Sequence, residues 1–202
     1  MAGAAGEFFD LSKNVPPSEF IMTPWAEREF AERNRRDRVD DPYGYCMPPG
    51  VPRIDVLQHP FKIVQTPRLV AMLHETAVNP TFRQVFVDGR PLPVAPEPTW
   101  LGYSIGRWEG NTLVVDTTGF KDGGWLDRGG HPHSDALAVV ERFRRINIGS
   151  MELSVTITDP KAYVRPRTVK IALHLLPDTD LLESSCESHE RTTAHRVLPP
   201  AP

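Results

Sequence analysis

Short segments of alternating apolar and polar residues fill most of the chain from residue 53 onward, and turns rich in glycine and proline separate them. The 21 prolines and 14 glycines are spread along the 202 residues as turn punctuation rather than gathered in one linker. This distribution disfavours a helical bundle, because proline interrupts helices and the apolar positions recur at every second residue. The pattern therefore predicts a mainly β protein.

Ten segments carry the strand pattern and are rich in Val, Ile, Phe and Thr. They are residues 53–58, 61–65, 69–75, 82–87, 101–108, 112–117, 137–146, 151–158, 168–176 and 180–186. Short turn signals between neighbours, such as Asp88-Gly89 and Gly110-Asn111, predict an antiparallel meander. A meander this long usually closes or curls, because its edges need protection. We therefore expect an antiparallel lipocalin-like barrel or a curled sandwich.

The residues before the strands are expected to contribute one helix. Thr23 is a favourable N-cap, Pro24 suits the first helical position, and the helix should run to about Arg36. Residues 1–21 have no period and are expected to be an irregular arm. We assign residues 1–52 to an arm, a short helix and a proline-rich wrapping loop. The barrel domain is expected to cover residues 53–190, followed by a flexible tail at 191–202.

Charge and motifs exclude several classes of function. The net charge is -3 and the pI is about 6.2, so the chain has no basic footprint for nucleic acid or an anionic membrane. No apolar stretch approaches the ~20 residues of a membrane span, and the first residues lack a signal-peptide pattern. We expect a cytoplasmic chain whose partner is a small apolar organic molecule, and we leave a homodimer open. Phosphate loops, dinucleotide fingerprints and nucleophile elbows are absent from the sequence, so we expect no cofactor.

The loop of residues 119–134 is the strongest functional candidate in the sequence, because it places glycines, acids and two histidines between strands. His131 and His133 are two residues apart and could share a metal ion, with Asp127 or His189 as a third ligand. The metal prediction is weak, because no further ligand motif supports it. Acid/base chemistry and a purely structural turn remain as alternatives.

Residues 137–146 place a carboxylate on an apolar face. Period two puts Glu141 between Val139 and Phe143, so it must be paired or have a raised pKa. An ion pair that fixes strand register is one interpretation, and an acid/base role is the other. The candidate partners for the ion pair are Arg107, Arg144 and Arg165.

These residues form a candidate catalytic set if the loop folds over the barrel mouth. We expect His133 to be the acid or base, Asp127 its orienting partner and Glu141 the second carboxyl group. His131 completes the catalytic candidates. The predicted substrate-binding residues are Tyr103, Trp125, Arg144 and Trp108. A structural alternative explains the same pattern: Trp125 fills the core under the loop, and Tyr103 is an ordinary strand residue.

The sequence contains two cysteines, Cys46 and Cys186, which admit either a disulfide or two free thiols. A bridge across so long a loop would stabilise the fold by roughly 5 kcal/mol in the chain-entropy model. It would require an oxidising compartment.

Several strings taken together resemble a large family of bacterial proteins of uncharacterised function, common in acidobacteria and proteobacteria. They are CMPPGVPR at 46–53, PFKIVQTP at 60–67, WEGNTLVV at 108–115, HPHS at 131–134 and ERFRR at 141–145. The resemblance covers roughly residues 8–190. It implies relatives that are secreted, and therefore a periplasmic or secreted protein if a signal peptide has been trimmed. It also favours a Cys46–Cys186 bridge.

The sequence therefore predicts a barrel that binds a small, largely apolar molecule. We expect it to catalyse a cofactor-independent isomerisation, cyclisation or elimination. The alternatives are a non-catalytic, lipocalin-like carrier, which needs the cavity but no titratable pair, and a structural protein with no cavity.

Overall fold

The computed structural model describes residues 2–4, 10–12, 20–57, 59–76 and 81–183. Its strands are β1 (Ala2–Ala4), β2 (Phe61–Gln65), β3 (Leu69–His74), β4 (Thr81–Phe86), β5 (Tyr103–Glu109), β6 (Thr112–Thr118), β7 (Ala138–Asn147), β8 (Ser150–Thr158) and β9 (Arg167–Leu175). The helices are α1 (Pro24–Arg35), the 3-10 turn η2 (Pro42–Tyr45) and α2 (Arg53–Val56). The predicted mainly β architecture with one N-terminal helix is confirmed.

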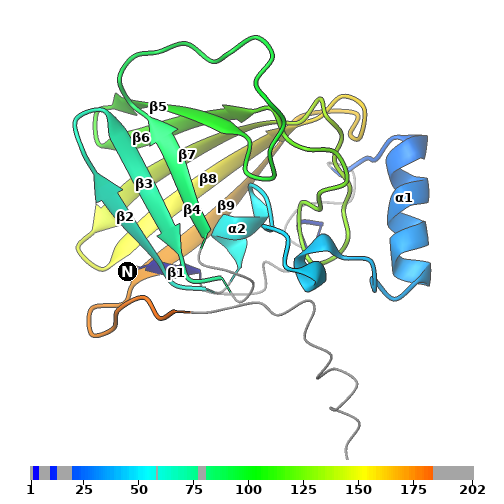
Figure 1. The fold of residues 1–202 in the computed structure, drawn as a ribbon, viewed down its shortest axis with the longest axis horizontal. Coiled ribbons are helices and arrows are strands. Elements are labelled where there is room, and N and C mark those ends of the chain that lie inside the picture. Colours follow the sequence, from blue (N-terminus) through cyan, green and yellow to red (C-terminus); the bar gives the residue numbers. More distant parts are fainter. Residues whose placement is uncertain (1, 5–9, 13–19, 58, 77–80, 184–202) are drawn as a thin grey trace, which may run out of the picture.

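The strands form one curled sheet in sequence order, and the sheet closes into a barrel through β1 (Figure 1). β1 is only three residues long and lies between β2 and β9, where Ala2 is the register partner of both Phe61 and Leu175. The β2–β9 seam is therefore the most weakly joined part of the barrel. The predicted irregular arm thus contains one strand, β1. Its three small residues carry no strand pattern in the sequence.

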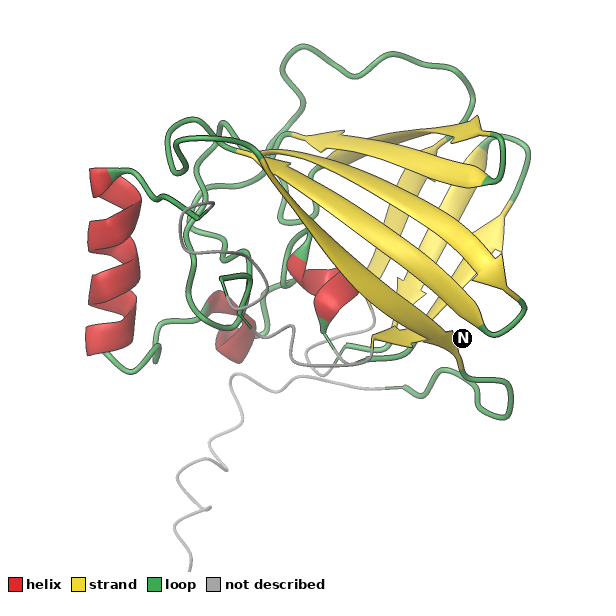
Figure 2. Cartoon of the chain, turned by 180° about the vertical axis from the view of Figure 1, so that it is seen from behind, coloured by secondary structure: helices red, strands yellow, loops and turns green. Residues whose placement is uncertain are grey.

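The barrel has two ends of different character (Figure 2). We call the end at the β7–β8 turn, residues 147–150, the hairpin end. Thr112 at the start of β6 pairs with Arg144, so β6 starts near this end and runs away from it. The segment 119–137 after β6 therefore lies at the opposite end, which we call the loop end. Helix α1 stands outside the barrel on that side.

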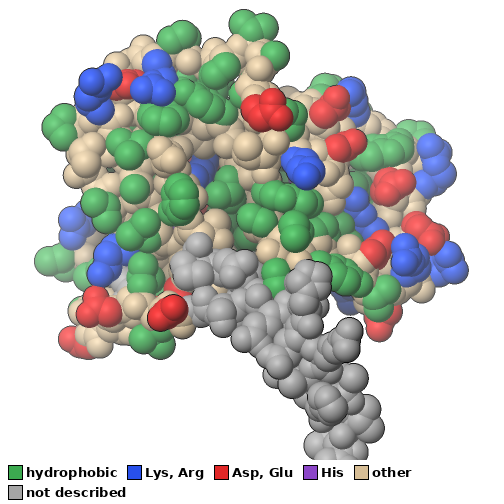
Figure 3. All heavy atoms as spheres, viewed as in Figure 1, with side chains coloured by type: hydrophobic (Ala, Val, Ile, Leu, Met, Phe, Trp, Pro, Cys, Tyr) green, Lys and Arg blue, Asp and Glu red, His purple; other side chains and the backbone are tan. Residues whose placement is uncertain are grey.

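Alternation along the strands fills the barrel with side chains. Leu153, Val155 and Ile157 of β8 are buried, whereas their neighbours Ser154 and Thr156 are half-buried. Such alternation is what a sheet with one dry and one wet face requires. The outer face is not uniformly polar. Figure 3 shows apolar side chains gathered on the face that β2–β4 present. Val64 of β2 and Phe82 of β4 are exposed apolar residues.

Helix α1 follows its local sequence signals. The Thr23 hydroxyl accepts a hydrogen bond from the Ala26 backbone N–H at 3.3 Å, which satisfies one of the free donors of the first turn. Ala26 and Arg33 are the buried positions of α1, and most of its other charged residues are exposed. None of the described helices has the length and hydropathy of a membrane span.

Three details of the predicted topology are wrong. Residues 53–56 are the helix α2 instead of a strand. All four side chains are buried, so the alternation of polar and apolar residues here does not correspond to one exposed and one buried face. Residues 180–183 are not a strand, and the rest of the predicted segment 180–186 lies outside the described residues. Strands β4 and β5 pair in parallel, because the connection 87–102 returns along the barrel before β5 starts.

Candidate functional site

A cluster of polar side chains occupies the barrel interior. Period two turns Arg83 and Glu141 inward from their strands, next to buried Val85 and Val139. The short helix α2 adds one acidic group from the chain segment before β2. The members of this interior cluster are Asp55, His74, Arg83, Ser104, Thr117 and Glu141, and all are buried.

Arg83 and Glu141 form a bidentate ion pair. The Arg83 Nη1 donates to Glu141 Oε1 at 3.0 Å, and Nη2 donates to Oε2. The guanidinium also donates to the hydroxyls of Thr117 at 2.9 Å and of Ser104 at 3.2 Å. This pairing corrects the predicted partners of Glu141, which were Arg107, Arg144 and Arg165. Arg83 precedes Glu141 by 58 residues, so only the closure of the sheet brings the two together.

Asp55 and His74 complete the cluster at longer distances from their charged neighbours. Asp55 Oδ2 lies 3.5 Å from Arg83 Nη1, and Asp55 Oδ1 lies 4.0 Å from His74 Nε2. While Asp55 is ionised, neither of its carboxyl oxygens has a hydrogen-bond donor among the described residues, but a protonated Asp55 can donate its O–H to Glu141. His74 Nε2 also has no hydrogen-bond partner among those residues. An unsatisfied buried polar atom costs about 1–3 kcal/mol, so this arrangement favours the protonated form of Asp55, which can donate to Glu141.

The electrostatics of the cluster follow from two carboxyl groups facing one guanidinium. Burial and the negative charge of Glu141 raise the pKa of Asp55 well above its usual range, although Arg83 opposes the shift. Burial, with a smaller effect of Arg83, lowers the pKa of His74 to about 3. At neutral pH, His74 is therefore uncharged, and the raised pKa of Asp55 favours the neutral carboxylic acid.

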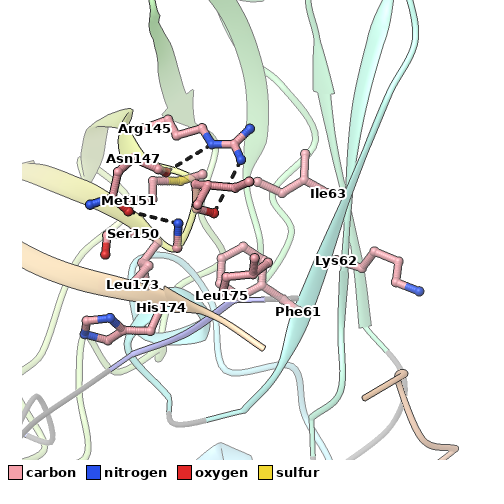
Figure 4. Close-up of a pocket in the computed structure, with 12 residues that line it drawn as sticks. Phe61, Lys62, Ile63, Arg145, Asn147, Ser150, Met151, Leu173, His174 and Leu175 are labelled. Carbon is pink, nitrogen blue, oxygen red and sulfur yellow. Dashed lines mark hydrogen bonds between the residues drawn. The ribbon is translucent and has the colours of Figure 1, made fainter. Parts of the chain in front are cut away.

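A pocket with a volume of about 320 Å³ lies at the hairpin end, between β2 and β9 (Figure 4). Its apolar lining is contributed by Phe61, Ile63, Met151, Leu173 and Leu175, and its lining also includes Arg145. The Phe61 ring stacks on the His74 ring with centroids 5.2 Å apart. Phe61 therefore contacts both the pocket and the interior cluster.

Asp127 and His131, two of the predicted catalytic residues, hold the 119–134 loop together. Asp127 Oδ2 accepts from the Leu11 backbone N–H and from His131 Nδ1, both at 2.6 Å. Its Oδ1 accepts from the His131 backbone N–H at 3.2 Å. The His131 ring lies against Phe20 and stacks on Phe30 of α1 with centroids 4.4 Å apart. These contacts fasten the loop to the N-terminal segments.

His133 has different partners from His131. Its Nδ1 donates to the Ser134 carbonyl at 3.1 Å, and burial lowers its pKa. The Ser134 hydroxyl donates to Asp159 at 2.8 Å. A Cβ on Gly124 would lie 2.2 Å from His133 Nε2, so the imidazole is packed against the backbone of Gly124. The loop thus brings Asp127 to His131, while Glu141 has its partners in the barrel interior.

The metal prediction for His131 and His133 gains no support from these contacts. His131 instead groups with Asp10 and Asp127, and the potential ligand atoms of the three lie within 4.8 Å of one another. The Asp127 oxygens already accept three N–H donors, which leaves little capacity for a cation. His189, the other suggested ligand, lies outside the described residues.

The four predicted substrate-binding residues lie apart from the pocket lining. Tyr103 is on the outer face, where it stacks on Phe86 and its hydroxyl accepts from Arg90. Arg144 is exposed and pairs with an acidic side chain of β8. The two tryptophans differ from each other. Trp125 is buried in the loop region under two arginine side chains, and Trp108 is half exposed at the end of β5.

Sequence reasoning missed Asp55, His74 and Arg83, and it assigned no role to Arg145, although period two places Arg145 on the same face of its strand as Glu141. The signal available was weak, since each is a single polar residue at an inward position of an element whose pairing was unknown. For the cysteines, Cys46 is disulfide-bonded. Its predicted partner, Cys186, lies outside the described residues.

Comparisons with protein families, with curated proteins and with solved structures find no match.

Proposed function

We propose that this barrel binds a small, largely apolar organic molecule at its hairpin end. The observation that carries the proposal is the 320 Å³ pocket between β2 and β9. Its volume lies at the lower end of the roughly 300–1,000 Å³ range of small-molecule sites. The mainly β barrel is compatible with such a function, although similar barrels serve unrelated ones.

The pocket lining supports an apolar ligand body. Phe61 and Leu173 are buried at its inner side, and Ile63 and Met151 are partly buried beside them. Their hydrocarbon surface would be covered by a bound molecule, and burial of apolar surface contributes about 25 cal/mol per Å². The pocket lies at the β2–β9 seam, where only three residues of β1 join the two strands.

The test is titration of the protein with N-phenyl-1-naphthylamine, a neutral apolar dye that fluoresces when bound. Ile63→Trp would fill the pocket, so we expect its affinity for the dye to fall at least tenfold. Val64→Trp is the matched control, because Val64 is the next residue on β2 and lies exposed outside the barrel. Equal dye binding by both variants and the unaltered protein, or no binding at all, would contradict the proposal.

A second candidate function is cofactor-independent acid/base catalysis, and the interior cluster favours it. Asp55 presents a carboxyl group of raised pKa, and His74 presents a neutral imidazole nitrogen 4.0 Å away. A buried site with two such groups suits isomerisation, cyclisation or elimination. In this version Asp55 transfers the proton, His74 assists, and the Arg83–Glu141 pair holds the acid in place. A substrate in the pocket would have to displace the Phe61 ring to reach them.

An elimination probe tests this candidate. With 5-nitrobenzisoxazole, a base removes the proton on C3 while the ring N–O bond breaks, giving a coloured cyanophenolate. We expect turnover that rises with pH as Asp55 ionises and that Asp55→Asn abolishes. Phe61→Ala should increase the rate by opening the path to Asp55. If the unaltered protein and Asp55→Asn turn over the probe at equal rates across pH 5–9, the cluster contains no catalytic base.

A further inference from the structure

Arg145 is an exposed basic residue that lines the rim of the pocket at the hairpin end. Val139, Glu141 and Phe143 are the buried, inward positions of β7. Arg145 follows them by period two at the hairpin end, where its side chain is exposed. Arg145 is the register partner of Met151, which also lines the pocket. Figure 4 shows its guanidinium beside Ile63, across the pocket from β9.

The guanidinium of Arg145 is held in place by backbone oxygens. Nε donates to the Asn147 carbonyl at 3.2 Å, and Nη2 donates to the Ile148 carbonyl at 3.4 Å. Carbonyl dipoles orient the group but do not neutralise its charge. The turn thus fixes a cation at the pocket while leaving further N–H donors available, since arginine has five.

Arg145 differs from its neighbours in having no acidic partner among the described residues. Arg142 pairs with Glu109 at 2.7 Å, and Arg144 pairs with Glu152 at 3.3 Å. Both of these arginines lie on the outer face of the same strand. Within the part of the chain that the structure describes, no Asp or Glu lines the pocket. An unneutralised guanidinium beside apolar side chains is the arrangement that recognises an anion.

The other basic groups of the lining do not compete for this role. Lys62 forms an ion pair with Asp180 at 3.0 Å, and Figure 4 shows its side chain directed away from the pocket. His174 is also directed away from the other labelled side chains there. The positive charge available to a ligand in the pocket is therefore that of Arg145.

We propose that Arg145 anchors the anionic end of the ligand, so that the ligand class is an apolar molecule carrying one carboxylate or a similar monoanion. The apolar body lies against Phe61, Ile63 and Met151, and the anionic group pairs with the guanidinium at the rim. This inference rests on the proposed binding function and specifies its ligand chemistry. A bidentate guanidinium pair accounts for preference of an acid over the corresponding alcohol.

Calorimetric titrations with octanoate and 1-octanol test the anchor, because the two probes share an apolar chain and differ in charge. For the unaltered protein, we expect octanoate to bind at least tenfold more tightly. Arg145→Gln should remove this preference and leave the affinity for octanol unchanged. Octyl sulfonate and octyl phosphate, titrated in parallel, identify which anionic group is preferred. Arg144→Gln is the matched control, since it removes the neighbouring outward charge.

Each outcome separates the anchor from the binding function. Equal binding of octanoate and octanol would overturn the anchor and leave the proposed function intact. An equal loss in Arg145→Gln and Arg144→Gln would also overturn it, because the preference would then reflect general surface charge. If neither octyl probe nor the neutral dye binds, both proposals fail. The thermal unfolding midpoint of each variant is compared with that of the unaltered protein. Equal midpoints show that a loss of binding is not caused by unfolding.

Discussion

At the scale of single residues, the main feature of this protein is a barrel interior in which charged side chains are buried. Arg83 faces two carboxyl groups and can neutralise only one of them. Glu141 takes the bidentate pairing, so Asp55 is driven toward its neutral form. The raised pKa of Asp55 and the lowered pKa of His74 can each be tested by substitution.

Removal of Arg83 should be strongly destabilising. Arg83→Met leaves Glu141 buried without its counter-charge, and breaking a buried pair in this way typically costs about 3–5 kcal/mol. The double variant Arg83→Met/Glu141→Gln should recover part of that loss, because no unpaired charge remains. Urea unfolding at pH 7 measures both. A single variant that loses less than about 1 kcal/mol would show that the pair is not fully desolvated.

The raised pKa of Asp55 predicts a pH-dependent effect of Asp55→Asn. The unfolded chain ionises this group near pH 3.8, whereas the folded chain keeps it protonated to higher pH. The stability that the neutral acid contributes is therefore present below pH 3.8 and is lost as pH rises through the folded-state pKa. We expect Asp55→Asn to gain stability relative to the unaltered protein between pH 4 and pH 8. A difference in unfolding free energy that does not change with pH would contradict this.

His74 predicts the opposite dependence. Its folded pKa is about 3 against 6.5 for the ordinary side chain, so only the unfolded chain takes up a proton between these values. The contribution of neutral His74 to the free energy of unfolding is therefore fully present above pH 6.5 and is lost as pH falls toward 3. His74→Phe keeps a ring against Phe61 but cannot titrate, so its stability should fall less on acidification. Between pH 7 and pH 4 the two proteins should diverge by about 3 kcal/mol, at roughly 1.4 kcal/mol per pKa unit. Parallel pH profiles would show that His74 is accessible to water.

At the scale of elements, local signals and long-range pairing were predictable to different degrees. Thr23 and Pro24 specify the start of α1, and period two located the longer strands, because both signals depend on neighbours in sequence. The alternation at 53–56 is too short to distinguish a strand from α2. Alternation also carries no information on strand direction, so the parallel β4–β5 pair was not foreseen. The Arg83–Glu141 contact needs the closed sheet.

The 119–134 loop is an element whose acids and histidines are predicted to be structural. Asp127→Asn should weaken charge-assisted hydrogen bonds to Leu11 and His131 and cost about 2–3 kcal/mol. Binding of the neutral dye at the hairpin end should be unchanged. Asp135→Asn is the control, because Asp135 is an exposed carboxylate whose ion pair with Lys161 is solvated. If Asp127→Asn keeps full stability and instead abolishes turnover of 5-nitrobenzisoxazole, the loop has the catalytic role predicted from the sequence.

At the scale of the whole molecule, the barrel separates two sets of chemical groups. The loop end is filled by the 119–134 segment, with α1 packed outside it. The hairpin end carries the pocket, whose Phe61 reaches the interior cluster. The loop of residues 119–134 contains the residue types that motifs can identify, so the sequence predicted it as the functional site. The pocket residues are mostly ordinary strand residues, so no motif predicted the pocket.

Chemical-shift mapping tests the central claim, binding at the hairpin end, most directly. The ¹⁵N-labelled protein would be titrated with octanoate while its backbone amide resonances are followed. The account predicts saturable shifts concentrated at residues 61–63, 145–151 and 173–175. It predicts no shifts in the loop of residues 119–134. Shifts centred on that loop, or none at saturating ligand, would contradict the account.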